Sequence, residues 1–512
     1  MPTPAEQSRE LFHRGRAYAR REEFSRAVEA FTGALDLSPQ DAELHFARGN
    51  AHVAQSQLLH ALEDFTNAIL HAPDLSAAWH NRATTHAERA EFVDAVFDYT
   101  EAIRLSPEDP DPLIGRGVAL LKLSKFDESR ADFDGALRLV PDSGRALFQR
   151  GLCHAAQKNH PAAIADFTAA LEFNPRQGRA YISRALAREA LGERGPALLD
   201  LTTALRVNPK LIEAYPHRAR LHFDLKKWRN ARDDYSAILR GDPTNSLARN
   251  HRAIASSELG LHDEADADLT AVIAADTTDA EGYFNRGLVR VRQKQWEGAA
   301  DDFTRVLALA PDDATAHLQR GNALVELLDP ERAILDFTRV IALEPGRARG
   351  FVARANAHLK MGNPTAARPD ALRAAELDPK RAGIRFLNGQ IEYDLGNHAR
   401  AIANFTTALE LDADHLPSQN SLAWILATTT TNLRDPERAL ELANRAAEAT
   451  SFSQPSHLDT LAAANAAMLR FSTAIDWQQK ALAMLPLEDR TEYLERLHLY
   501  EAGMSFHEVR KG

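Results

Sequence analysis

The sequence predicts an all-α protein, a solenoid of about 14 helical hairpins closed by a C-terminal capping helix. Two observations support this prediction. Small residues recur every 34 residues over most of the 512-residue chain. Apolar residues recur at i, i+3, i+4 and i+7 within each half of that interval, which is the spacing of an amphipathic helix. One hairpin of this length cannot bury its apolar face alone, so the units are expected to stack.

Three columns define the 34-residue unit, whose first copy begins at residue 8. In that copy, position 8 is Gly15, position 20 is Ala27 and position 24 is Phe31. Position 24 is large and apolar in the other in-register units except at Ala371, and the fourteenth unit has Gln478 there. Small residues at positions 8 and 20 allow two helices to approach closely, and the large side chain fills the space beside that contact. In ten units a proline such as Pro39 follows and ends the second helix, because proline lacks an N–H.

The period divides the chain into five segments. A short N-terminal extension is followed by twelve units in register, a divergent unit, a fourteenth unit and a capping helix, which occupy residues 1–7, 8–415, 416–454, 455–488 and 489–512. The divergent unit contains a Thr-rich insertion, after which Asp435 and Pro436 predict the start of the next helix. We interpret the insertion as a spacer. The last segment is expected to cover the open end of the stack with an amphipathic helix.

This pattern resembles the tetratricopeptide repeat (TPR) family over nearly the whole chain, and the divergent end is similar to the closing segment of long bacterial arrays of that family. The resemblance implies a right-handed superhelix of helical hairpins. First helices would line its concave face and second helices its convex face.

Position 7 is usually apolar in the family but is arginine in eleven successive units here, and position 23 is aspartate in ten. In an antiparallel hairpin these positions fall within about one helical turn of each other. We therefore predict a ladder of ion pairs, within a unit or between neighbours, because a partly buried arginine favours a bidentate carboxylate. A basic stripe that binds a polyanion is the alternative, and the matching aspartates argue against it. The predicted pairs include Arg82 and Asp98, Arg116 and Asp132, Arg150 and Asp166, Arg184 and Asp200, and Arg286 and Asp302.

Composition and charge exclude several classes of protein. The balance of 61 basic and 72 acidic residues gives a net charge of −11, which argues against general nucleic-acid binding. We find no apolar run of membrane-spanning length and no secretion signal at the start, so we expect a cytoplasmic protein without membrane insertion. The single Cys153 excludes a disulfide framework and is interpreted as a buried apolar residue.

We find no catalytic or metal-binding motif. The sequence has no HExxH, GxxxxGK or GxSxG pattern, and histidines such as His217 and His222 are not spaced as an i, i+4 metal pair. We therefore expect no enzyme activity, no cofactor, no metal and no small-molecule substrate.

The resemblance places positions 2, 5, 6, 9, 12 and 13 of the first helices on the concave face. Several of these positions hold large apolar side chains beside side-chain amides, a combination that can hold an extended peptide. The alternative, which stays open for each phenylalanine, is packing between neighbouring repeats. The predicted partner-binding residues are Phe46, Asn50, Asn81, Phe148, Gln149, Phe284, Asn285, Gln319, Asn322 and Asn356.

Some members of the family bind C-terminal carboxylates through a five-residue clamp. Asn50 and Asn81 match its two asparagines, but Phe46, Asp111 and Gly115 occupy the other three places. Asp111 would repel a carboxylate, so we predict that this chain does not bind partners in that way.

Together these features predict a non-catalytic scaffold that binds protein or peptide partners in the concave groove. The alternative is a regulatory or targeting subunit of a separately encoded enzyme, docked through its convex face or its last repeats. An unrecognised transferase is a third possibility. The absence of a non-repeat segment longer than the 24-residue tail argues against it.

Overall fold

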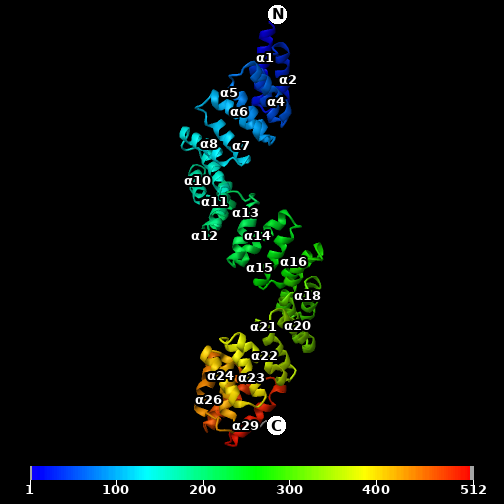
Figure 1. The fold of residues 1–512 in the computed structure, drawn as a ribbon, viewed down its shortest axis with the longest axis vertical. Helices are drawn as coiled ribbons and strands as arrows, with labels where there is room; N and C mark the ends of the chain where they lie inside the picture. The colour runs from blue at the N-terminus through cyan, green and yellow to red at the C-terminus, as the bar shows by residue number, and fades with distance from the viewer. Residues whose placement is uncertain (1–2, 508–512) are drawn as a thin grey trace. The chain divides into compact units, whose positions relative to one another are not determined.

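The computed structural model describes residues 3–507, and these form 29 α-helices, one 3₁₀-helix and no strand (Figure 1). The prediction of an all-α protein built from paired helices is confirmed. Contacts divide the chain into two compact units, residues 1–248 and 249–512. None of the described helices combines the length and apolar character needed to cross a bilayer.

The first unit consists of consecutive helical hairpins. Its helices are α1 (Pro4–Arg20), α2 (Phe24–Leu37), α3 (Ala42–Ala54), α4 (Leu58–His71), α5 (Ser76–Glu88), α6 (Phe92–Leu105), α7 (Pro110–Lys122), α8 (Phe126–Leu139), α9 (Gly144–Ala156), α10 (His160–Phe173), α11 (Gly178–Ala190), α12 (Arg194–Val207), α13 (Ala214–Asp224) and α14 (Trp228–Gly241). The boundary between the units falls within α15 (Ser246–Glu258).

The second unit continues the same pattern. Its further helices are α16 (His262–Ala275), α17 (Ala280–Arg292), α18 (Trp296–Leu309), α19 (Ala314–Glu326), α20 (Pro330–Leu343), α21 (Ala348–Lys360), α22 (Pro364–Leu377), α23 (Ala382–Asp394), α24 (His398–Leu411), α25 (Leu416–Thr428), α26 (Pro436–Ala449), α27 (Pro455–Ala467), α28 (Phe471–Ala483), the 3₁₀-helix η1 (Leu487–Asp489) and α29 (Thr491–Glu501).

Local sequence explains how each hairpin begins and turns. The Asp41 carboxylate caps α3 by accepting from the backbone N–H of Glu43 at 2.9 Å. The turn between the two helices requires one residue with positive φ, which glycine supplies at Gly192 (φ 79°). Most of the other repeats have a non-glycine residue at this turn, such as Leu328 (φ 60°). These turns therefore hold a left-handed backbone at some cost in free energy.

Packing inside each hairpin follows a rule between positions 8 and 24. Where position 8 is glycine, position 24 is phenylalanine, and a Cβ added to that glycine would lie 2.4–2.8 Å from the ring. Gly117 and Phe133 form one such pair. Where position 8 is alanine, position 24 is leucine, tyrosine or alanine, as in Ala185 and Leu201. A Cβ at position 8 would overlap the phenylalanine ring as it is placed in the glycine repeats, which explains why each of these phenylalanines faces a glycine.

The Thr-rich insertion joins α25 to α26 through residues 429–435. Thr428 and Thr429 are buried, and the backbone N–H of Asp435 donates to the carbonyl of Leu426 at 3.1 Å. Asp435 then caps α26, with Pro436 at its first position, as the sequence indicates. The insertion is therefore folded back onto the helix that precedes it.

Candidate functional site

The arginines and aspartates of positions 7 and 23 meet within ten successive repeats. The Arg82 Nε and Nη2 atoms donate to the two oxygens of Asp98 at 2.8 and 2.7 Å. The same bidentate geometry recurs, 16 residues apart, from Arg48 with Asp64 to Arg354 with Asp370. The aspartates of this arginine–aspartate ladder are buried, whereas their arginines keep partial solvent contact.

The third nitrogen of most of these arginines reaches the preceding repeat. Arg82 Nη1 donates to Thr66 Oγ1 at 3.1 Å, and Thr66 in turn donates to the Leu62 carbonyl of its own helix at 2.7 Å. Arg116 makes the same bond to Thr100 at 3.0 Å. One guanidinium group thus joins three helices of two repeats. Hydrogen bonding to Asp132 also raises the pKa of the Arg116 guanidinium above its ordinary value.

Repeat twelve lacks the arginine–aspartate pair, because asparagines stand at both positions. Asn388 replaces the arginine, is buried, and donates to the carbonyls of Ala371 at 2.9 Å and Ile384 at 3.0 Å. A buried carboxylate reappears on the first helix at Glu392, which accepts from Arg368 Nε of the preceding repeat at 2.9 Å. In repeat twelve the ion pair therefore joins neighbouring repeats, with the carboxylate on the first helix and the guanidinium group on the second helix of the preceding repeat.

The phenylalanines predicted to bind a partner pack against the aromatic residue of their own repeat. The centroid of Phe46 lies 6.0 Å from that of Phe65, Phe148 lies 5.7 Å from Phe167, and Phe284 lies 5.6 Å from Phe303. All three predicted residues stay half-buried. They therefore contribute to the core with one face and leave the other face at the surface.

The predicted amides fall into two groups. Some bond to an asparagine of the preceding repeat: Asn81 Nδ2 donates to Asn50 Oδ1 at 2.6 Å, and Asn285 Nδ2 donates to Oδ1 of Asn250, which was not predicted, at 3.0 Å. Gln149 is half-buried on α9. The others come together in the second unit, where Gln319, Asn322 and Asn356 line a cavity of about 760 Å³ between α17 and α23. We call this the amide cavity.

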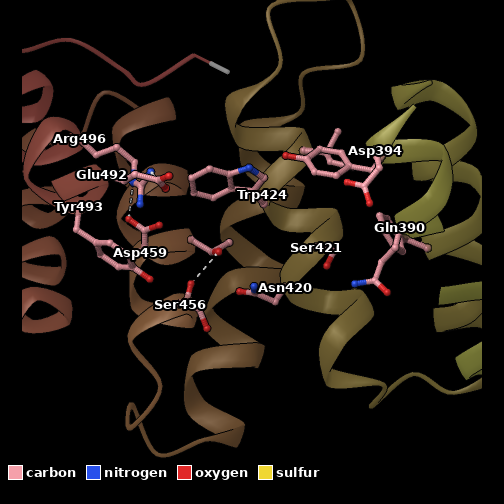
Figure 2. Close-up of a pocket in the computed structure, with 14 residues that line it drawn as sticks. Gln390, Asp394, Asn420, Ser421, Trp424, Ser456, Asp459, Glu492, Tyr493 and Arg496 are labelled. Carbon is pink, nitrogen blue, oxygen red and sulfur yellow. Dashed lines mark hydrogen bonds and ion pairs between the residues drawn. The ribbon is translucent and has the colours of Figure 1, made fainter. Parts of the chain in front are cut away.

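A second cavity, of about 380 Å³, lies at the C-terminal end of the second unit, and we call it the terminal pocket. Figure 2 shows Gln390 and Asp394 from α23 on one side, Trp424 and Asn420 from α25 in the middle, and the side chains of α27 and α29 on the other. Its lining consists of Gln390, Tyr393, Asp394, Phe405, Asn420, Ser421, Trp424, Ile425, Ser456, Asp459, Thr460, Glu492, Tyr493 and Arg496. Gln390 and Asp394 also line the amide cavity, so the two spaces adjoin at α23.

A buried ion pair fixes the capping helix α29 against this pocket. Arg496 Nε donates to Asp459 Oδ1 at 2.8 Å, and the Gln478 amide donates to the same oxygen at 2.8 Å. Burial raises the pKa of Asp459, and the Arg496 charge opposes that rise. The Arg496 guanidinium lies 4.8 Å from the ring centroid of Tyr493 and 5.4 Å from that of Trp424. Sequence reasoning missed this site, because its residues have no common spacing in the chain.

Among the described residues, one group has the composition of a metal site. The ligand atoms of His86, Glu91 and Asp94 lie within 4.8 Å of one another. Arg89 already contacts Glu91 at 2.8 Å, and His86 Nδ1 lies 2.7 Å from the same carboxylate. The hydrogen bonds from Arg89 and His86 lower the pKa of Glu91 to about 2. These contacts account for the cluster without a cation.

Stacked helical hairpins with a repeating packing pattern define a helical-repeat protein. Profiles described as "Tetratricopeptide repeat" match residues 114–178, 280–313, 318–382, 352–415 and 386–454, and one described as "TPR repeat" matches residues 15–56. The chain belongs to the tetratricopeptide repeat family. Proteins of this family generally mediate protein–protein interactions.

Several solved structures are similar to parts or most of the chain. They include YrrB, described as a TPR protein with an unusual peptide-binding site, at 22% identity and a TM-score of 0.33, covering 37% of this chain and 98% of that one. Another is a chain of the APC/C hetero-tetramer Cut9-Hcn1, at 15% identity and a TM-score of 0.41, covering 96% of both chains. PilF of Pseudomonas aeruginosa matches at 17% identity and a TM-score of 0.38, covering 42% of this chain and 99% of that one. A search of curated protein sequences finds no match.

Proposed function

We propose that this protein is a non-catalytic scaffold that binds an extended peptide or a peptide-like segment of a protein partner along its first helices. The amide cavity is the observation that supports this function best. Gln319, Asn322 and Asn356 come from consecutive first helices, and Asn322 and Asn356 are exposed. Side-chain amides can bond to both the N–H and the C=O groups of an extended backbone.

Apolar side chains complete this surface. Val291, Trp296 and Leu359 line the same cavity and offer contact area for the side chains of a bound peptide. Hydrogen bonds to the backbone would supply affinity, and these apolar contacts would supply selectivity. The carboxylate clamp is incomplete, because Phe46, Asp111 and Gly115 replace three of its five residues. This favours recognition of internal peptide segments rather than free C-termini.

A selection from random displayed peptides on the immobilised full-length chain tests the proposal. We expect enriched peptides to protect backbone amides of α19, α21 and α23 from hydrogen exchange. We expect the double variant Asn322→Ala with Asn356→Ala to lose at least about tenfold in affinity, because two bidentate partners of the backbone are removed. Asn404→Ala, which removes an amide from the second helix α24, is the matched control and should bind normally.

An equal loss in both variants, or protection confined to second helices, would contradict binding along the first helices. Protection of second helices would instead support the alternative, a regulatory or targeting subunit docked by its convex face. One observation favours that alternative: Val93 and Phe97 on α6 are 69% and 62% exposed. They lie one helical turn apart and so share a face of that helix.

A further inference from the structure

The terminal pocket has the chemistry of a site for a cationic group. Three carboxylates, those of Asp394, Asp459 and Glu492, line it together with one guanidinium group, that of Arg496. The formal charges of these three carboxylates and the one guanidinium group sum to −2. We propose that this pocket binds a lysine or arginine side chain of the peptide that occupies the first helices, an inference that rests on the proposed function.

The resident arginine does not balance the acidic groups. Arg496 Nε bonds to Asp459 at 2.8 Å, and Arg496 Nη1 lies 3.6 Å from Glu492. The Arg496 side chain is only 7% exposed, so its charge faces these two carboxylates rather than the opening. Asp394 lies across the pocket on α23 (Figure 2). An incoming cation would reduce the excess negative charge, whereas an anion would increase it.

The aromatic lining also favours a cation. Tyr393, Trp424 and Tyr493 line the pocket, and electron-rich ring faces attract ammonium and guanidinium groups. The chain itself shows that two of these rings accept such a group, since the Arg496 guanidinium lies 4.8 Å from Tyr493 and 5.4 Å from Trp424. A second guanidinium or ammonium group in the pocket would meet the same kind of surface.

Hydrogen-bond acceptors complete the site. Gln390 and Ser421 line the pocket, and their side-chain oxygens can accept hydrogen bonds from an ammonium or guanidinium group. The cavity of about 380 Å³ suits one long side chain, and its junction with the amide cavity at Gln390 and Asp394 would let the rest of the peptide continue along the first helices.

Single amino-acid probes test the pocket separately from peptide binding. The chain has five tryptophans, so the full-length protein can be labelled with 5-fluorotryptophan and followed by ¹⁹F NMR, with Trp424→Phe assigning the signal of Trp424. The probes are the N-acetyl amides of arginine, lysine, citrulline and glutamate. Citrulline keeps the shape of arginine but carries no charge. Arginine and lysine together report which cationic head group is preferred.

We expect arginine or lysine to shift the Trp424 signal saturably, with half-saturation at roughly millimolar concentration, and citrulline to bind at least about tenfold more weakly. Asp394→Asn should weaken the cationic probe about 5- to 10-fold, because one of three carboxylates is removed near the ligand. Added salt should weaken it as well. Glu326→Gln removes a carboxylate that lines only the amide cavity and should leave the Trp424 titration unchanged.

The inference is overturned if citrulline or glutamate binds as well as arginine and lysine, or if Asp394→Asn and Glu326→Gln behave alike. These outcomes are distinct from failure of the proposed function. If displayed peptides protect the first helices while the cationic probes leave Trp424 unshifted, the scaffold stands and the pocket assignment fails. If the probes bind while no peptide is enriched, the scaffold fails.

Discussion

Replacing Asp98 by asparagine tests whether the arginine–aspartate ladder holds neighbouring repeats together. The substitution keeps the size of the side chain and removes its charge. In the structure Asp98 is 3% exposed, and it accepts from Arg82 at 2.8 and 2.7 Å. The change leaves Arg82 half-buried without its carboxylate, while its bond to Thr66 at 3.1 Å remains.

The expected cost follows from these contacts. Removing one partner of a buried ion pair typically costs about 3–5 kcal/mol, because the remaining charge is left without compensation. The Arg82 side chain is 15% exposed and keeps Thr66, so we expect the lower end of that range, about 3 kcal/mol. Glu101→Gln on the same helix α6 is the matched control. Glu101 accepts from Arg104 at 2.9 Å, but Arg104 is 64% exposed, and such a surface pair contributes at most about 1 kcal/mol.

Urea unfolding combined with hydrogen exchange measures the difference. Exchange is needed because a long repeat array need not unfold in a single cooperative step. Amides of α4, α5 and α6 should lose protection in Asp98→Asn and keep it in Glu101→Gln. The apolar double variant Arg82→Met with Asp98→Leu should recover part of the loss, because no buried charge is left unpaired. A loss below about 1 kcal/mol in Asp98→Asn, or one no larger than in Glu101→Gln, would refute the structural role of the ladder.

Four further predictions concern packing, turns, protonation and reactivity. Gly117→Ala should destabilise the protein by about 1–3 kcal/mol through overlap with Phe133, and adding Phe133→Leu should reduce that loss; urea titration of both variants checks this. Leu328→Gly should stabilise the protein by about 1 kcal/mol, since φ there is 60° and the side chain is 87% exposed; a lower melting temperature would contradict it. Burial lowers the pKa of His222 below 6.5, so the unfolded state takes up its proton at higher pH than the folded state. The stability from His222 is therefore present above about pH 6.5 and lost as the pH falls further, with a slope of up to about 1.4 kcal/mol per pH unit, and His222→Gln should flatten this dependence. Cys153 is fully buried and burial raises its thiol pKa, so a thiol reagent should react with it only on unfolding, and fast reaction of the folded chain would contradict this.

The sequence alone was sufficient to predict the hairpins and their stacking. Helix periodicity and the recurrence of small residues such as Gly15 are local properties, and each is repeated along the chain. The sequence also selected the residues of the ladder, but it left open whether pairs form within or between repeats. That choice depends on the register of neighbouring hairpins. The structure shows that Arg82 forms its ion pair with Asp98 in its own repeat and donates a further hydrogen bond to the Thr66 hydroxyl in the preceding one.

The surface of the first helices was predictable only in part. The resemblance to a family placed Asn322 and Asn356 on one face, and the structure gathers them in one cavity. It could not show that Phe46 packs against Phe65 or that Asn81 bonds to Asn50, because these contacts depend on side-chain rotamers in neighbouring helices. The covariation of glycine with phenylalanine was present in the sequence, but the overlap of a Cβ with the ring gives its cause.

The sequence by itself determined the class of this protein, because a fixed period and amphipathic helices leave one way to bury the apolar faces, which is to stack them. The terminal pocket was decided only by the tertiary structure. Asp394, Trp424, Asp459 and Arg496 come from four helices and from positions that share no spacing in the chain. Their proximity follows from how α29 packs across the end of the second unit, where Arg496 pairs with Asp459. Periodicity describes what each repeat has in common, and the charge and shape of this pocket arise where the repeat pattern ends.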